Sequence, residues 1–222
     1  MNKAGTIAVC TLAAATLLSY ALPATAADDL SWYAGAGLGR GDAKRTGSWA
    51  EHADLAFRTQ GVTSLTTISN GNSAWKMFGG YVFNENVSVE AAYSRLGRFG
   101  GTSTVTAPAA GTGSGTWDAS ALSLAAIGSL PIHENRVAAT GKLGLARTRL
   151  GVSAAASGGG TSAAFGPSND RINLMLGVGM RFDLTKQFGV RAEYDYYNNV
   201  GDGTTTGQTG VAVWSLNGFY RF

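Results

Sequence analysis

The sequence predicts an all-β protein, an eight-stranded antiparallel up-and-down transmembrane β-barrel. Three observations lead to this fold class. Eight segments alternate an apolar row with a more polar row at a period of two, the pattern of strands with two unlike faces. Long and short connections between these segments alternate strictly, as in outer-membrane barrels. The chain ends on Tyr220-Arg221-Phe222, whereas soluble domains usually end in polar residues.

The first four expected strands lie in the first 130 residues. In residues 31–40 an apolar row that starts at Trp32 opposes a row made mostly of glycine. Residues 75–83 and 87–97 continue the alternation and are joined by a turn of three residues. Residues 122–130 set leucine and alanine against serine. Each stretch has two unlike faces, so each is expected to be a strand.

The other four expected strands are residues 137–150, 172–183, 190–197 and 211–222. The alternation is clearest in 172–183, where a row from Ile172 to Phe182 is apolar throughout. Strands of about nine to fourteen residues are long enough to cross an outer membrane when tilted. The even number of strands returns both termini to one side, which we expect to be the periplasm.

The long connections are predicted to be loops on the cell exterior, rich in Gly, Ser, Thr and Ala. They cover residues 41–73, 98–115, 151–170 and 198–210. Large aromatic residues near the strand ends predict two girdles at the lipid interfaces, because aromatic side chains favour that depth. The girdle residues are Trp32, Trp75, Tyr81, Phe83, Tyr93, Phe182, Tyr194 and Tyr196. A soluble sandwich would instead scatter its aromatics through a core.

Residues 1–26 are predicted to be a secretory signal peptide, and residues 27–222 the barrel domain. Lys3 precedes an apolar run that ends near a small-residue cleavage pattern at Ala24-Thr25-Ala26. The single cysteine, Cys10, falls within this leader, so disulfides and thiolate metal sites are not expected. Removing Lys3 from the 17 basic residues leaves 16 against 14 acidic ones, too even a balance to indicate nucleic-acid binding. No cofactor or metal is expected.

Three motifs resemble the OmpA-like transmembrane domain of bacterial outer-membrane proteins. They are residues 78–84 with 89–97 (FGGYVFN and VEAAYSRLG), residues 191–202 (RAEYDYYNNVGD) and the closing Tyr220-Arg221-Phe222. The resemblance spans essentially the whole chain after the leader and implies an eight-stranded barrel in a Gram-negative outer membrane. The larger members carry a peptidoglycan-binding domain after the barrel. Because this sequence stops at Phe222, we do not expect a cell-wall tether.

The carboxy-terminal strand also resembles the signal by which such barrels are recognised for assembly. Its outward row would present Trp214, Leu216, Tyr220 and Phe222. This resemblance implies the barrel-assembly machinery as a partner, together with outer-membrane lipid and lipopolysaccharide.

Charged residues in the inward rows predict a network inside the barrel. They are Lys76, Glu90, Lys142, Arg181, Arg191, Glu193 and Asp195. The resemblance implies acid–base pairs at Glu90 and Arg191, and a rearranged pairing in which Glu90 is shared among Arg181, Arg191 and Lys142. Eight strands leave an interior filled by side chains. We therefore expect a structural or surface-interaction role without a wide pore, and the alternative is a narrow channel or solute-binding barrel.

Two further features are open to a functional reading. Some small outer-membrane barrels modify lipid A with a Ser/His pair at the outer rim, but His133 is expected on the periplasmic side and His52 in a long loop. We therefore predict that the protein is not an enzyme. Residues 49–58 predict a short amphipathic helix in the first loop. Its Trp49 and Phe57 either cap the barrel mouth or form a patch for a host or phage partner.

Overall fold

The computed structural model describes residues 32–69, 71–133 and 136–222. The predicted signal peptide lies outside these ranges. Eight strands form the wall of the barrel: β1 (Trp32–Ala43), β3 (Gly71–Asn84), β4 (Val87–Ala107), β5 (Gly111–His133), β6 (Val137–Gly158), β8 (Ser168–Asp183), β9 (Phe188–Asp202) and β10 (Gly207–Arg221).

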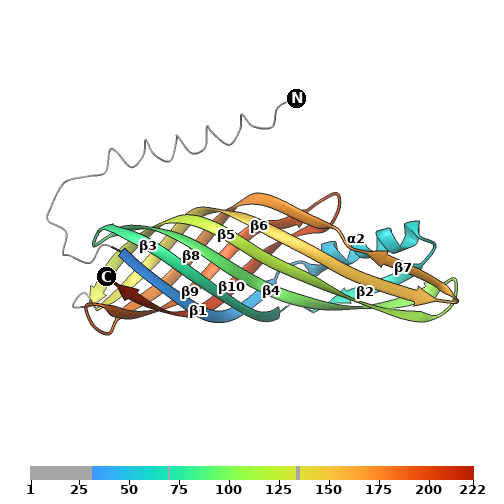
Figure 1. The fold of residues 1–222 in the computed structure, drawn as a ribbon, viewed down its shortest axis with the longest axis horizontal. Coiled ribbons are helices and arrows are strands. Elements are labelled where there is room, and N and C mark those ends of the chain that lie inside the picture. Colours follow the sequence, from blue (N-terminus) through green and yellow to red (C-terminus); the bar gives the residue numbers. More distant parts are fainter. Residues whose placement is uncertain (1–31, 70, 134–135) are drawn as a thin grey trace, which may run out of the picture.

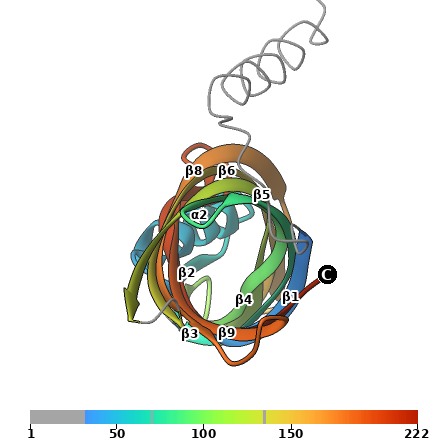
Figure 2. The ribbon, with the colours of Figure 1, turned by 90° about the vertical axis from the view of Figure 1, so that its left-hand side faces the viewer.

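Each wall strand is antiparallel to its neighbours, and the ring closes. The pairs β4–β5 and β1–β10 complete the circle, so β10 lies between β9 and β1. Figure 2 shows the closed ring along its axis. The eight-stranded up-and-down barrel predicted from the sequence is therefore confirmed.

Three more elements occupy one end of the barrel: helix α2 (Thr46–Thr59), strand β2 (Thr63–Ile68) and strand β7 (Thr161–Phe165). We call this end the helix end, and we call the opposite end, with the C-terminus and the short connections, the turn end (Figure 1). Strand β2 pairs with the helix-end part of β4, and β7 pairs with β6. The side chain of Gln60 joins α2 to β7 by hydrogen bonds with both backbone groups of Ala164.

The predicted strand lengths and loop boundaries are wrong at the helix end. Strands β4, β5 and β6 have 21, 23 and 22 residues, and β4 and β5 stay paired as far as Val105 and Gly111. Most of residues 98–115 and 151–170 is therefore strand, and residues 41–73 hold α2 and β2. Beyond the membrane the outward face meets water, so the lipid-facing apolar row from which the strand bounds were predicted ends there.

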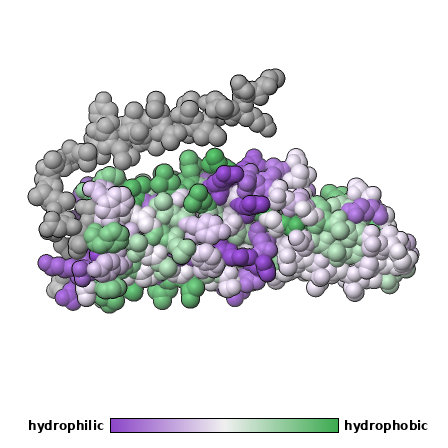
Figure 3. All heavy atoms as spheres, viewed as in Figure 1, coloured by the Kyte–Doolittle hydropathy of each residue, from purple (hydrophilic) through white to green (hydrophobic). Residues whose placement is uncertain are grey.

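The outer wall of the barrel is apolar over its middle. Side chains exposed there include Leu38, Met77, Leu122, Leu124, Leu143, Leu145, Leu174, Leu176, Val178, Met180 and Leu216. Figure 3 shows this hydrophobic band, then a hydrophilic belt, then the extension at the helix end. No helix in the described ranges is long and apolar enough to span a membrane.

The aromatic residues border the apolar band at both edges. Near the helix end Trp75 packs on Tyr93, and Tyr194 packs on Trp214 at 4.5 Å between ring centroids. Near the turn end the ring contacts link Trp32 to Tyr81, Tyr81 to Phe83, and Phe188 to Tyr220. The other girdle residues predicted from the sequence are exposed (Phe182) or half-buried (Tyr196).

Candidate functional site: the closed lumen

Six charged side chains meet in the middle of the lumen, and all are at least nine-tenths buried. They are Lys76, Glu90, Lys142, Arg191, Glu193 and Asp195. Each occupies an inward position of its strand: one on β3, one on β4, one on β6 and three on β9. We call these residues the charge network. Three cations face three anions, so the network is neutral as a whole.

Contacts in the charge network run across the lumen. Glu90 accepts from Arg191 at 2.6 Å, from Lys142 at 3.0 Å and from the hydroxyl of Tyr33 at 3.1 Å. Lys142 also lies 2.5 Å from Glu193. These bonds join strands that are not neighbours in the wall.

The other half of the network centres on Lys76. Its ammonium group contacts Glu193 and lies 2.9 Å from Asp195. Asn217 on β10 donates to Glu193 at 2.8 Å. Small inward residues make room for these groups: a Cβ at Gly37 would overlap the side-chain oxygen of Asn217.

An aromatic cage that the sequence did not indicate surrounds Arg191. The guanidinium carbon lies 4.3 Å from the ring centroid of Phe78, 5.5 Å from that of Phe219 and 5.6 Å from that of Tyr33. Cation–π contacts of this kind stabilise a desolvated cation. The three rings occupy inward rows, so the alternation along each strand could have predicted from the sequence that they face the lumen. Their convergence depends on how β1, β3 and β10 pair.

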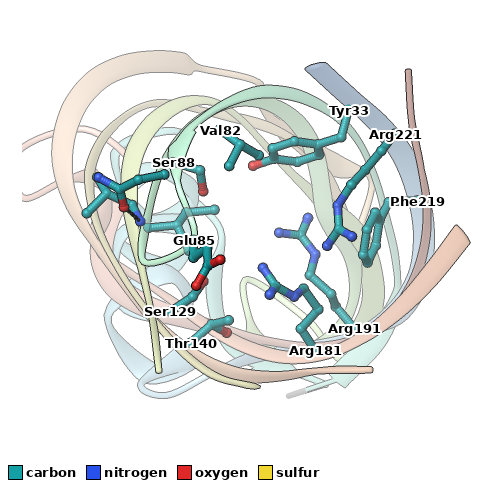
Figure 4. A pocket seen from close by; sticks show the side chains of 13 residues that line it. Tyr33, Val82, Glu85, Ser88, Ser129, Thr140, Arg181, Arg191, Phe219 and Arg221 are labelled. Atoms are coloured by element: carbon teal, nitrogen blue, oxygen red, sulfur yellow. Dashed lines mark hydrogen bonds between the residues drawn. The ribbon is translucent and has the colours of Figure 1, made fainter. Parts of the chain in front are cut away.

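Arg181 does not share Glu90, so this part of the predicted pairing is wrong. It pairs instead with Asp183 at 3.2 Å, and Arg221 contacts the same carboxylate at 2.9 Å. Arg181 is the direct cross-strand partner of Arg191, and each of these like charges has a carboxylate of its own, Asp183 for Arg181 and Glu90 for Arg191. Figure 4 shows Arg181, Arg191 and Arg221 directed into the cavity at the turn end, opposite Ser129 and Thr140. Asp183 was not among the predicted site residues.

Between the charge network and the helix end, the lumen is filled by a hydrophobic core. Leu96, Phe99, Trp117 and Leu150 from the wall are fully buried. Helix α2 closes this core with Trp49, Ala50, Ala53 and Phe57, and Trp49 packs on Phe99 at 5.5 Å between centroids.

The amphipathic helix in residues 49–58 is present, but its apolar face does not form a surface patch. Trp49 and Phe57 are 0% exposed because they insert into the barrel mouth. Of the two alternatives predicted for these side chains, the structure shows the first, a cap on the barrel mouth, and the surface patch is not formed.

Of the two histidines, His52 joins two elements at the helix end. The ring nitrogens of His52 lie 2.8 Å from the carbonyl oxygen of Ser48 and 3.0 Å from that of Gly203, which ties α2 to the β9–β10 turn. His133 is the last residue of β5 and pairs through its backbone with Val137 at the turn end. In the part of the chain that the structure describes, no three His, Cys, Asp or Glu side chains are grouped to hold a metal ion.

The outward row of the closing strand faces the surroundings of the barrel. Trp214, Leu216, Tyr220 and Phe222 are 60%, 66%, 37% and 56% exposed. Trp214 lies near the helix-end aromatics, whereas Tyr220 and Phe222 lie at the turn end and stack on each other.

Comparisons with known proteins agree with this architecture. The family model described as OmpA-like transmembrane domain matches residues 26–222. Outer membrane protein A of Shigella flexneri is 30% identical over 213 residues, and that of Serratia marcescens is 29% identical over 222 residues. Each alignment covers 94% of this chain and 54% of the relative. The chain thus spans about half the length of the curated relatives it matches.

Solved structures show the same fold at low sequence identity. The outer membrane protein OprG of Pseudomonas aeruginosa superposes with a TM-score of 0.54 at 12% identity, covering 87% of this chain and 96% of that one. The attachment invasion locus protein Ail of Yersinia pestis superposes with a TM-score of 0.50 at 16% identity, covering 88% and 100%. At these identities the likeness concerns the fold alone.

Proposed function

This chain belongs to the OmpA-like transmembrane domain family and is an outer-membrane β-barrel, and on that premise we propose that it acts as a closed barrel with a structural and surface-interaction role. It presents the helix end to the cell exterior and conducts no solute through its lumen. It is not an enzyme. Residues 1–26 serve as its secretory leader, and its outward C-terminal row serves as the signal read by the barrel-assembly machinery.

The observation that carries this proposal is a lumen closed at two successive levels by different means. The charge network fills the middle with paired groups such as Lys76 and Glu193. The hydrophobic core, sealed by Trp49 and Phe57 of α2, fills the helix-end half. Water and ions meet an apolar plug as well as a polar one. The cavity at the turn end has a volume of about 30 Å³, and Arg191 of the charge network is one of the residues that line it.

Planar-bilayer recording tests the closed state. We expect the reconstituted protein to add no steady current to that of the bare bilayer, and we expect the same of a Glu90→Ala variant, because α2 and the apolar core still block the path. Discrete current steps from the wild-type barrel would contradict the closed barrel and favour a narrow channel. Steps from the variant alone would assign the whole seal to the charge network.

Surface labelling tests the orientation. The described residues contain no cysteine, so single cysteines can be placed at Ala109 in the β4–β5 turn and at Glu85 in the β3–β4 turn. With a membrane-impermeant maleimide on intact cells, we expect Ala109→Cys to react and Glu85→Cys to react only after lysis. The reverse pattern would overturn the proposed orientation.

The surface available to a host or phage partner lies on the outer side of the helix end. Leu55 on α2 is 54% exposed and Leu65 on β2 is 70% exposed, while the opposite face of α2 is buried. We expect Leu55→Asp and Leu65→Asp together to reduce cell adhesion or phage sensitivity. Leu130→Asp, near the turn end, is the matched control for losing an exposed leucine. Equal adhesion and phage sensitivity in all strains would refute a role for this surface.

A further inference from the structure

Three arginines lie on the outer wall at the helix-end edge of the apolar band, on the two strands that flank β5. Arg95 and Arg98 belong to β4 and Arg149 belongs to β6, with Ser120 of β5 between them. We call Arg95, Arg98 and Arg149 the arginine patch. Tyr93 of the helix-end girdle lies two residues before Arg95 on the same face, so the patch begins where the apolar band ends.

A β-bulge places two of these arginines on one face. The pairing of β4 with β5 shifts between Arg95, which faces Ser120, and Gly97, which faces Ala119. Residues three apart in a regular strand point to opposite sides. After the bulge, Arg95 and Arg98 both point outward, with side chains 40% and 60% exposed, while Leu96 is fully buried. Bulges are often found where a strand must redirect a side chain.

Positive charge exceeds negative charge in the patch. Asp118 accepts from Arg95 at 2.5 Å and from Arg98 at 2.8 Å, so one carboxylate serves two guanidinium groups. Arg149 makes no ion pair with any described residue, because its cross-strand partner Asp170 is bonded to Arg147 at 3.1 Å. Three cations and one anion leave two positive charges at the membrane edge.

The patch borders a hollow in the outer surface. The hollow has a volume of about 190 Å³ and is lined by Tyr93, Arg95, Asp118, Ala119, Ser120, Arg149 and Gly151. Arg95 and Arg149 line the hollow from the two strands on either side of Ser120, which is the cross-strand partner of both. A planar guanidinium matches the geometry of a phosphate and can bond it through two N–H groups.

We propose that the arginine patch binds the phosphate groups of a lipid A-type glycolipid in the outer leaflet. The occupant is a lipid and not a free phosphate, because the wall directly below the patch offers acyl chains a continuous apolar surface. On that surface Leu122 is 59% exposed, Leu143 57% and Leu145 55%. Phosphate above and acyl chain below match the order of groups in such a lipid. The proposal rests on the orientation given under Proposed function, in which the helix end faces the lipopolysaccharide leaflet.

Lipid titration of the folded barrel in zwitterionic detergent tests the patch. The probes are bis-phosphorylated hexa-acylated lipid A, the same lipid with both phosphates removed, and inorganic phosphate. The variants are Arg95→Gln and Arg149→Gln, and the matched control is Arg40→Gln, which removes one exposed charge from β1. We expect each patch variant to bind phosphorylated lipid A about tenfold more weakly than wild type, the loss of one charge-assisted contact. We expect the control to stay within about twofold, as for an exposed ion pair.

The outcomes distinguish the possible ligands, and they distinguish a failure of the lipid A site from a failure of the proposed orientation. Equal affinity of wild type and both patch variants overturns the site, as does equal affinity for lipid A with and without phosphate. Displacement of lipid A by an equal concentration of inorganic phosphate overturns the choice of a lipid. Heat-modifiable gel mobility confirms that each variant is folded before titration. Because detergent-solubilised protein has no sidedness, this result does not depend on the cysteine-labelling test of orientation.

Discussion

Replacing Glu90 by glutamine removes a negative charge that bonds Arg191 at 2.6 Å and Lys142 at 3.0 Å. The carboxylate is 3% exposed and accepts bonds from both cations and from Tyr33. Without it, three buried cations remain against two anions, Glu193 and Asp195. Removing one partner of a buried pair leaves an uncompensated charge and costs about 3–5 kcal/mol. We expect the free energy of unfolding to fall by that amount.

A second substitution separates the effect of charge balance from that of lost contacts. In the double variant Glu90→Gln with Arg191→Met, the remaining network of Lys76 and Lys142 with Glu193 and Asp195 is again neutral. Methionine is apolar and flexible, and it suits the aromatic cage formed by three rings around position 191. We expect the double variant to be less destabilised than the sum of the two single variants, by about 2 kcal/mol or more.

Equilibrium urea unfolding in lipid vesicles measures these free energies, with tryptophan fluorescence and heat-modifiable gel mobility as two independent signals. Arg147→Met is the matched control, because it breaks an ion pair whose arginine side chain is 65% exposed. Exposed pairs contribute about 0–1 kcal/mol, so the control should stay close to wild type. Strict additivity of the single variants, or a Glu90→Gln cost no larger than that of the control, would refute the reasoning.

Four further substitutions, one of which is a control, test other parts of the barrel. Gly37→Val places a side chain where Asn217 lies and should prevent stable folding, whereas Gly141→Val, with open space around its Cβ position, should fold as judged by heat-modifiable mobility. Trp49→Ala empties a fully buried site beneath α2 and should lower the unfolding free energy in urea by about 3–5 kcal/mol. Phe222→Ser should reduce the fraction of protein recovered as folded barrel from cells while leaving refolding in detergent unchanged, and equal recovery would argue against an assembly signal.

The sequence predicted the parts of the fold that have a period of two. Lipid on one side and a polar lumen on the other make the alternation strong in residues 172–183, and the strand there was found. The helix was found as well, since Trp49 and Phe57 recur at helical spacing. The extent of β4 and β5 past Gly97 and Gly115 was missed, because small residues on both faces carry no period.

In the lumen, prediction from the sequence was limited in a different way. Charged residues such as Lys76 and Glu193 were recognised because they interrupt an otherwise small inward row. Their partners could not be read from sequence, since β3 and β9 meet only across the barrel, at a height that depends on strand tilt and register. Arg181 illustrates the consequence. Its place in an inward row was predicted, but its bond to Asp183 was not, because the distance from Arg181 to each carboxylate in the lumen depends on the register of the strands.

Along β4 and β6, the apolar side chains pass from the outward row to the inward row. The level at which this change occurs identifies the edge of the membrane. On β6 the outward row passes from Leu145 to Arg147, while the inward row passes from Lys142 to Leu150. On β4 the inward row passes from Glu90 to Leu96 at the bulge.

Below this level the apolar face meets lipid and the polar groups pair inside, whereas above it the apolar side chains are inside, as in a soluble protein. A wall that inverts in this way needs a plug such as α2 to cover its new apolar interior. It also presents exposed charge at the level where the phosphates of a surrounding lipid leaflet lie. The closed mouth and the arginine patch thus follow from one inversion, so shifting it by two residues on β6, with Leu145→Arg and Arg149→Leu, should weaken lipid A binding and lower stability together.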